Sequence, residues 1–213
     1  MRIPIIVQAK KYSTRVPFKN NIVLPGHLFN LTEWALFAAS QLQAQIGLES
    51  DVILTTGFTP AIADNLRRLY PSRPFSWLPR PKFLDGDHNS NRLTILHALS
   101  SFYDSEQLDL IKSVVILQPS APFRHAETIE HVAQIAVECK ENYAFGGAYH
   151  IIQPETIFWD KENEWEFRDN SKGCWDEAEQ IDIDTYDGAF NAARVAVLIG
   201  QTRLEERICT GQN

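Results

Sequence analysis

Hydrophobic positions along the chain alternate between short β-branched runs and longer stretches with helical spacing. The short apolar runs predict buried strands over residues 3–8, 51–55, 113–117 and 143–151. Apolar residues at helical spacing predict helices over residues 31–45, 59–70, 90–103, 126–140 and 185–198. Strands that alternate with helices in this way predict an α/β domain with three layers, in which helices cover both faces of a mainly parallel, Rossmann-like sheet.

Local signals support the boundaries of the first helix. Asn30 is a residue type favoured at the position that caps a helix N-terminus, and Gly47 follows the last apolar position, where helices commonly end. These two residues therefore predict a helix that begins at Leu31 and ends just before Gly47.

Two carboxylates alternate with two isoleucines in the segment Ile181-Asp182-Ile183-Asp184-Thr185. In an extended strand, residues two apart point to the same face, so Asp182 and Asp184 would emerge together while the isoleucines face the core. Close carboxylates favour a hard divalent cation such as Mg²⁺, which binds carboxylate and phosphate oxygens. An edge strand with a solvated acidic face is the alternative interpretation.

Composition limits the classes of function. The 213 residues, 44% of them apolar, predict a single domain over residues 1–213 with a full core. A net charge of −7 argues against a nucleic-acid surface, and no stretch approaches the roughly 20 apolar residues that a membrane span needs. The three cysteines form no metal-binding or disulfide pattern, so we expect a soluble protein of the cytoplasm with no membrane partner.

The loop after the first strand is rich in cations. Residues 10–19 contain four, at Lys10, Lys11, Arg15 and Lys19. Such side chains can hold a triphosphate and stabilise the charge that develops when phosphoryl bonds break. The loop lacks the glycines of a Walker motif, and a solvated basic loop is the alternative.

Two further loops follow predicted strands, at the edge of a parallel sheet where ligands bind. Leu117 to Arg124 contains two prolines that restrict the loop and place Gln118 at the tip of the third strand. Arg80-Pro81 precedes Asp87 and the helix that starts near Ser90. A surface turn is the alternative for each.

Taken in order, these segments resemble the acylneuraminate cytidylyltransferase (CMP-sialic acid synthetase) family, as a divergent and shortened member. The family's first loop, A-R-x-x-S-K-x-x-P-x-K-N, is matched by residues 9–20, and its L-Q-P-T-S-P-L-R by residues 117–124. Its R-P, x-L-x-x-D and H-A-L elements are matched by Arg80-Pro81, Leu84, Asp87 and residues 97–99. Its metal motif D-I-D-T is intact at residues 182–185.

The resemblance implies a nucleotidyltransferase fold and a CTP-dependent reaction. The anomeric hydroxyl of a nonulosonic sugar acid would attack the α-phosphorus of CTP, giving the CMP derivative and pyrophosphate, with Mg²⁺ bound by Asp182 and Asp184. Asp182 or a metal-bound water would receive the hydroxyl proton. The implied catalytic residues are Lys10, Lys19, Asp182 and Asp184. The implied nucleotide-binding residues are Ala9, Lys10, Ser13, Arg15, Lys19, Asn20, Arg80, Asp87 and Ser90, and the implied acceptor-binding residues are Gln118, Ser120 and Arg124.

Several positions depart from the family pattern. Lys10 replaces an arginine, Thr14 replaces a lysine, and Thr55-Thr56-Gly57 replaces S-T-D, which removes a carboxylate. The family's dimerisation arm is reduced to a short insertion around residues 152–180, which weakens the expectation of a homodimer. Two alternatives therefore stay open: a smaller acceptor such as a phosphonate, or a degenerate nucleotide-binding module without catalysis.

Overall fold

The computed structural model describes residues 1–11, 13–27, 29–57, 75–85, 91–145, 148–159, 168–169 and 181–210. Within these ranges a seven-stranded sheet has the order β3-β2-β1-β4-β6-β5-β7. The strands are β1 Ile5–Ala9, β2 Val52–Thr56, β3 Ser76–Pro79, β4 Val114–Leu117, β5 Tyr143–Phe145, β6 Tyr149–Ile152 and β7 Arg168–Asp169. Only β6 pairs antiparallel, with β4 and with β5, so the predicted mainly parallel sheet is confirmed.

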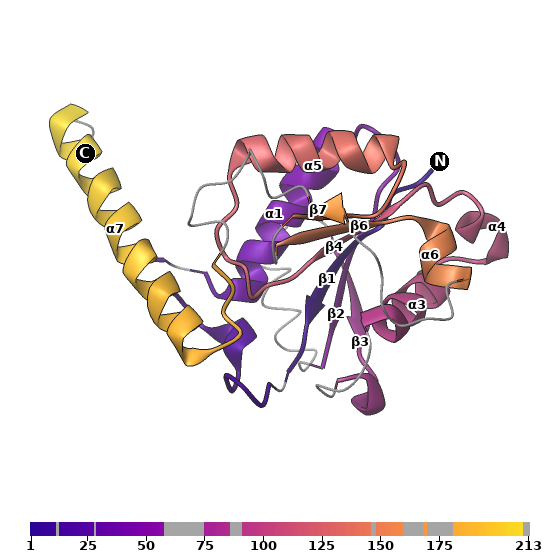
Figure 1. Cartoon of the computed structure of the whole chain (residues 1–213), viewed down its shortest axis with the longest axis horizontal. Helices are drawn as coiled ribbons and strands as arrows, with labels where there is room; N and C mark the ends of the chain where they lie inside the picture. Colours follow the sequence, from indigo (N-terminus) through magenta and orange to yellow (C-terminus); the bar gives the residue numbers. More distant parts are fainter. Residues whose placement is uncertain are drawn as a thin grey trace.

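Helices cover both faces of this sheet, which confirms the three-layer α/β fold. On one face lie α1 Leu31–Ile46 and α5 Ala126–Glu138 (Figure 1). The other face carries α3 Asn91–Phe102, α4 Ser105–Leu108 and α6 Pro154–Trp159. The long helix α7 Tyr186–Thr210 extends along one side of the molecule, and two short 3₁₀ helices span Lys19–Asn21 (η1) and Lys82–Leu84 (η2).

Strand β1 is buried along its whole length and separates two hydrophobic clusters. Ile5 and Val7 pack on the side of α1 and α5, whereas Ile6 packs on the side of α3. This division follows from the strand geometry, because successive side chains point to opposite faces. A continuous apolar run is what a strand covered by helices on both faces requires.

The predicted boundaries of α1 are confirmed. Asn30 and Glu33 form a reciprocal capping box, in which each side chain accepts a hydrogen bond from the backbone N–H of the other residue. Gly47 ends the helix in the left-handed conformation, with φ of 66°. Leu31 N donates to Ile22 O at 3.1 Å and Thr32 Oγ1 donates to Asn20 O at 2.9 Å, which ties the start of α1 to the loop after β1.

Four expectations about local structure need correction or lie outside the described residues. The single strand predicted over 143–151 is wrong, because β5 and β6 form an antiparallel pair, and the sequence places Gly146 and Gly147 between them. Residues 181–185 form no strand, although Ile183 is fully buried as expected. The last helix is longer than predicted, and the helix predicted over 59–70 lies outside the described residues.

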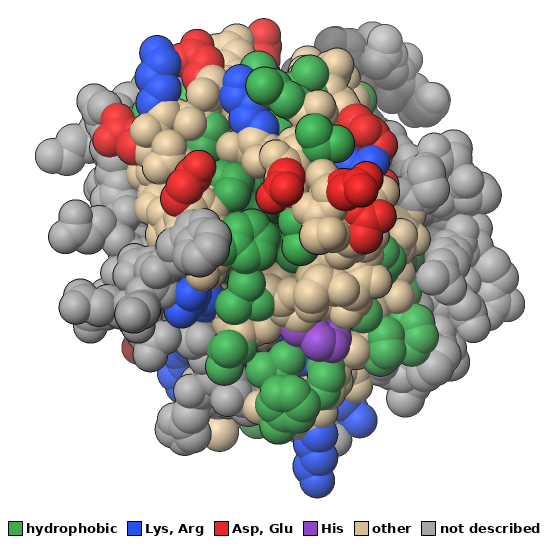
Figure 2. Space-filling view, turned by 90° about the vertical axis from the view of Figure 1, so that its right-hand side faces the viewer, with side chains coloured by type: hydrophobic (Ala, Val, Ile, Leu, Met, Phe, Trp, Pro, Cys, Tyr) green, Lys and Arg blue, Asp and Glu red, His purple; other side chains and the backbone are tan. Residues whose placement is uncertain are grey.

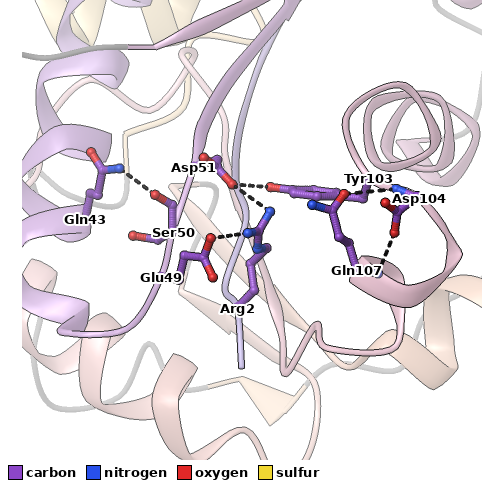
Figure 3. Close-up of polar contacts among 8 residues, drawn as sticks. All are labelled: Arg2, Gln43, Glu49, Ser50, Asp51, Tyr103, Asp104 and Gln107. Carbon is purple, nitrogen blue, oxygen red and sulfur yellow. Dashed lines mark hydrogen bonds and ion pairs between the residues drawn. The ribbon is translucent and has the colours of Figure 1, made fainter.

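At the amino ends of β1 and β2 a polar cluster ties the sheet together (Figure 3). Arg2 pairs with Glu49 and, at 3.5 Å, with Asp51, and its guanidinium lies 5.0 Å from the centre of the Tyr103 ring. The Tyr103 hydroxyl donates a hydrogen bond of 2.9 Å to Asp51. This cluster stabilises the edge of the sheet opposite the carboxyl ends of the parallel strands, where ligands bind in such folds.

The surface on the side of α3 and α4 is mixed in character. Figure 2 shows acidic side chains in its upper half and apolar side chains in its centre and lower half, while the visible lysines and arginines are scattered. Among the described residues of this face there is no basic stripe of the kind that binds nucleic acid. In the described part of the chain, no helix has the length and apolar character needed to cross a membrane.

Candidate functional site

A polar pocket lies at the carboxyl ends of β1 and β4 and has a volume of about 290 Å³. It is lined by Gln8, Lys10, Ser13, Arg15, Lys19, Asn20, Asn91, Gln118, Pro119, Ser120 and Asp184. The loop after β1 and the segment before α7 are far apart in the sequence but lie side by side at the bottom of Figure 1, joined by ion pairs. The ends of neighbouring parallel strands thus bring the predicted loops together.

Most of the predicted site residues line this pocket. They are Lys10, Ser13, Arg15, Lys19, Asn20, Gln118, Ser120 and Asp184. Ala9 is buried in β1, and Arg80, Asp182 and Arg124 are not among the lining residues. Asp87 and Ser90 lie outside the described residues.

Sequence reasoning missed two polar residues of the pocket, Gln8 and Asn91. Gln8 is the one polar residue in the otherwise apolar strand β1, and this interruption was the available signal. The side chain is 8% exposed, and its Nε2 is buried without a hydrogen-bond partner. Buried polar groups in proteins are usually hydrogen-bonded, so an unmet group in a pocket wall marks a place for a ligand atom.

The pocket carries an excess of positive charge. Lys10, Arg15 and Lys19 contribute three positive charges against the one negative charge of Asp184, which leaves an excess of two. The whole chain has a net charge of −7, so this local excess is opposite in sign to the protein. Such a pocket attracts a small anion.

Asp184 is paired with two of these cations. Its Oδ1 contacts Lys19 Nζ, and its Oδ2 lies 3.0 Å from Arg15 Nη2. The Lys19 side chain is only 13% exposed, whereas that of Arg15 is 61% exposed. The Lys19 pair is therefore the stronger of the two, because solvent screens an exposed pair.

Asp182 is partly buried and is not among the residues that line the pocket. Burial raises the pKa of its carboxyl, and so does the neighbouring charge of Asp184, whereas a hydrogen bond with Ser120 and the charges of Lys19 and Arg15 act in the opposite direction. Its Oδ1 is buried and has no hydrogen-bond partner. An ionised carboxylate in this position lacks a compensating group on one oxygen, which a cation would supply.

The donor set formed by Asp182 and Asp184 fits Mg²⁺. Within the described ranges no group of three or more histidine, cysteine, aspartate or glutamate side chains is placed to hold a metal. Mg²⁺ is commonly bound by only one or two carboxylates, with the remaining positions filled by water and substrate phosphates. The unsatisfied oxygen of Asp182 and the position of Asp184 in the pocket wall agree with that arrangement.

The acidic segment is held by backbone contacts rather than by a sheet. Ile183 N donates to Ser120 O at 2.8 Å, and the Ile183 side chain packs in a buried cluster with Leu24 and Leu31. Thr185 Oγ1 then accepts from Gly188 N at 3.1 Å, as an N-cap of α7. These contacts fix the two carboxylates on either side of one buried isoleucine, which corrects the predicted strand.

Gly188 allows the first turn of α7 to lie against this segment. A Cβ atom at this position would be 2.3 Å from the backbone oxygen of Asp182. That separation is far below a van der Waals contact, so any other residue would push the helix away from the carboxylates. The glycine therefore contributes to the geometry of the acidic pair.

Arg124 supports the loop that carries Gln118. Its Nη2 donates to Gln118 O at 2.6 Å, and its guanidinium lies 5.4 Å from the centre of the Tyr149 ring. These contacts connect the loop after β4 to β6. The acceptor-binding role of Arg124 stays a prediction, and the structure gives the residue a positioning role beside it.

Arg80 is buried at the end of β3, with a side chain that is not exposed at all. Its Nη2 donates to Thr55 O at 3.2 Å, and its Nη1 lies 3.9 Å from Asp85 Oδ1. Burial lowers the pKa of Arg80 to about 10, and the charge of Asp85 opposes that change. Arg80 thus braces the ends of β2 and β3, while its predicted contact with the nucleotide stays a prediction.

Comparison with characterised proteins confirms the resemblance inferred from the motifs. The chain is 32% identical over 136 residues to CMP-N,N'-diacetyllegionaminic acid synthase of Legionella pneumophila. The match covers 63% of this chain and 53% of the relative, so the chain spans about half the length of that protein. No model of a protein family matches the chain.

Solved structures show the same architecture. A cytidylyltransferase from Leptospira borgpetersenii superposes with a TM-score of 0.60 over 91% of this chain and 85% of its own, at 13% identity. The 4-diphosphocytidyl-2C-methyl-D-erythritol synthase of Anaerococcus prevotii superposes with a TM-score of 0.55 over 91% and 97%, at 10% identity. The chain has a nucleotidyltransferase fold. At these identities the superpositions establish the fold, and the activity has to be argued from the site.

Proposed function

We propose that this chain is a cytidylyltransferase that uses CTP to activate a nonulosonic or related sugar acid, forming the CMP derivative and pyrophosphate. The observation that carries the proposal is the pocket at the carboxyl ends of β1 and β4. It combines three cations with a carboxylate that belongs to the intact Asp-Ile-Asp-Thr motif. The relative from Legionella pneumophila, whose name describes a CMP–sugar acid synthase, supports this chemistry.

The three cations would bind the triphosphate of CTP. In the reaction, an acceptor hydroxyl oxygen forms a bond to the α-phosphorus, the bond from that phosphorus to the bridging oxygen breaks, and the hydroxyl proton would pass to Asp182 or to water. The leaving pyrophosphate gains negative charge, which Lys10, Arg15 and Lys19 would neutralise from the pocket wall. The protein contributes mainly orientation and charge, because this chemistry asks for no covalent intermediate.

Asp182 and Asp184 would hold Mg²⁺ beside these phosphates. When bound, the ion supplies positive charge to the phosphate oxygens. The residues of this chain hold the carboxylates in place, because the hydrogen bond from Ile183 N to Ser120 O fixes the acidic segment. The fit of the two carboxylates to Mg²⁺ supports this part of the proposal.

The nucleoside would lie against the polar floor of the pocket. Asn20 is 3% exposed, its Nδ2 donates to Lys10 O at 2.9 Å, and its Oδ1 is buried without a partner. Gln8 presents a second unmet polar group to the same pocket. A ribose or cytosine with both donors and acceptors would satisfy these groups and lower the free energy of binding.

The acceptor would enter beside the loop of Gln118 and Ser120, both of which line the pocket. A phosphonate is the second candidate acceptor, because a cavity of about 290 Å³ is small for a nucleotide together with a bulky sugar acid. Pyrophosphate release from CTP and Mg²⁺, measured with each class of acceptor, distinguishes the two. Release with neither class, although CTP binds, would contradict the transferase and favour a nucleotide-binding module.

A further inference from the structure

In the loop after β1, the peptide group between Lys10 and Lys11 is held at both ends by side chains from other segments. The carbonyl of Lys10 accepts from Asn20 Nδ2 at 2.9 Å, and the N–H of Lys11 donates to Asp85 Oδ1 at 3.2 Å. The carbonyl and the N–H belong to the same planar unit, so two hydrogen bonds fix its orientation. The Cα atom of Lys10 belongs to the same planar unit, so the point from which its side chain leaves the backbone is held with it.

Asp85 reaches this peptide through a space left by Gly57. A Cβ atom on Gly57 would lie 2.4 Å from Asp85 Oδ2 and 2.7 Å from its Cγ. The carboxylate therefore occupies the volume that any side chain at the end of β2 would fill. Position 57, where the family pattern has a carboxylate, is a glycine in this chain, and the carboxylate of Asp85 lies next to it.

The position of Asp85 is itself fixed by buried contacts. Its side chain is 7% exposed and lies 3.9 Å from the fully buried Nη1 of Arg80. Arg80 N donates to Thr56 O at 2.8 Å, and Arg80 Nη2 donates to Thr55 O at 3.2 Å. The chain of contacts therefore runs from the end of β2, through Arg80 and Asp85, to the peptide between Lys10 and Lys11.

We propose that Asp85 is a positioning residue for nucleotide binding, which holds the Lys10–Lys11 peptide so that Lys10 faces the phosphates. Gly57 is required because it leaves room for the Asp85 carboxylate. The inference rests on the proposed nucleotide-binding function of the pocket. The carboxylate of Asp85, in the loop after β3, would then replace the carboxylate that is missing at position 57, at the end of β2.

The first test compares three variants by calorimetric titration of CTP with Mg²⁺. Asp85→Ala removes the acceptor for the Lys11 N–H and should weaken binding about tenfold, which corresponds to about 1.4 kcal/mol. Asp85→Asn keeps an oxygen that can accept this hydrogen bond and should retain most of the affinity. Gly57→Ala keeps the charge of Asp85 but displaces the carboxylate, and it should weaken binding as Asp85→Ala does.

A control separates positioning from general stability. Asp51 also accepts hydrogen bonds from an arginine and a tyrosine, but at the opposite end of the sheet (Figure 3). Asp51→Ala should lower the melting temperature and leave the dissociation constant for CTP unchanged. Equal weakening of CTP binding in Asp51→Ala and Asp85→Ala would overturn the proposal, because both effects would then be general.

A double-mutant cycle tests whether Asp85 acts through Lys10. If it does, Asp85→Ala should cause little further loss of CTP affinity in a protein that already carries Lys10→Ala. Losses that simply add would overturn the proposal, since Asp85 would then act independently of Lys10.

Amide exchange keeps this inference separate from the proposed function. The Lys11 amide proton should exchange faster in Asp85→Ala than in the unaltered protein, with no nucleotide present. If the unaltered protein binds no nucleotide, the proposed function fails and so does the role of Asp85 in nucleotide binding, even where exchange confirms the anchor. If it binds CTP and the Asp85 variants bind equally well, only the positioning role fails.

Discussion

Replacement of Asp184 by asparagine should have opposite effects on nucleotide binding with and without metal. In the structure the carboxylate pairs with Lys19 and Arg15, the same cations that would bind phosphates. A triphosphate that binds without Mg²⁺ must compete with Asp184 for them. Asp184→Asn removes the competing charge and keeps the shape of the side chain, so metal-free binding should become tighter.

The size of this effect follows from the exposure of the two pairs. Arg15 is 61% exposed, so its pair with Asp184 contributes at most about 0.5 kcal/mol. Lys19 is 13% exposed, and its pair contributes on the order of 1–2 kcal/mol because solvent screens it less. Together they amount to about 1–2.5 kcal/mol, which predicts a gain of roughly 5- to 60-fold in metal-free affinity, at about 1.4 kcal/mol for each tenfold change.

The assay is calorimetric titration of CTP in EDTA and in Mg²⁺, with unaltered protein and Asp184→Asn. In EDTA the variant should bind CTP more tightly than the unaltered protein does. Addition of Mg²⁺ should increase the CTP affinity of the unaltered protein but not that of the variant. Asp187→Asn is the matched control, because it removes one negative charge from an exposed position three residues away. Weaker binding of Asp184→Asn in EDTA, or equal tightening in Asp187→Asn, would refute the reasoning.

Three further predictions concern stability. Gly188→Ala should lower the free energy of unfolding by more than about 1 kcal/mol, because the added Cβ would lie 2.3 Å from Asp182 O. Replacing glycine by alanine usually stabilises a helix, so a variant that is stabilised in urea denaturation would contradict this prediction. Ile183→Ala should lower the free energy of unfolding by about 2–5 kcal/mol, and Ile181→Ala by less, because Ile183 is fully buried and Ile181 is partly exposed. Equal losses in urea denaturation would contradict the buried position of Ile183. Burial lowers the pKa of His150 to about 4 from an unfolded value of 6.5, so the unfolded state binds more protons between these values. The contribution of neutral His150 to the free energy of unfolding should therefore be fully present above pH 6.5. The free energy of unfolding should fall by at most about 3 kcal/mol as the pH drops to 4. His150→Gln should flatten this dependence and the exposed His125→Gln should not.

The layers of the fold could be predicted because they depend on local patterns. The continuous apolar runs of β1, β2 and β4 and the cap at Asn30 are strong signals, and the structure confirms them. Apolar periodicity does not show where a chain reverses, so it predicts one strand where β5 and β6 form an antiparallel pair. In the sequence, Gly146 and Gly147 are the signal that favours two segments over one strand.

The site was predictable in its loops and less so in its contacts. Eight of the predicted residues line one pocket, since parallel strands deliver the loops that follow them to the same edge. The alternation of Asp182 and Asp184 predicts a strand, whereas the segment forms no strand and is held by Ser120 and the cap of α7. The role of Asp85 is invisible in the sequence, because it depends on a through-space fit with Gly57.

The central claim is that the pocket binds CTP for a metal-dependent transfer. The most direct test is a calorimetric titration of the unaltered protein with CTP, ATP, GTP and UTP, each with and without Mg²⁺. The account predicts a preference for CTP that depends on Mg²⁺. Binding of no nucleotide, or equal binding of all four regardless of the metal, would contradict it.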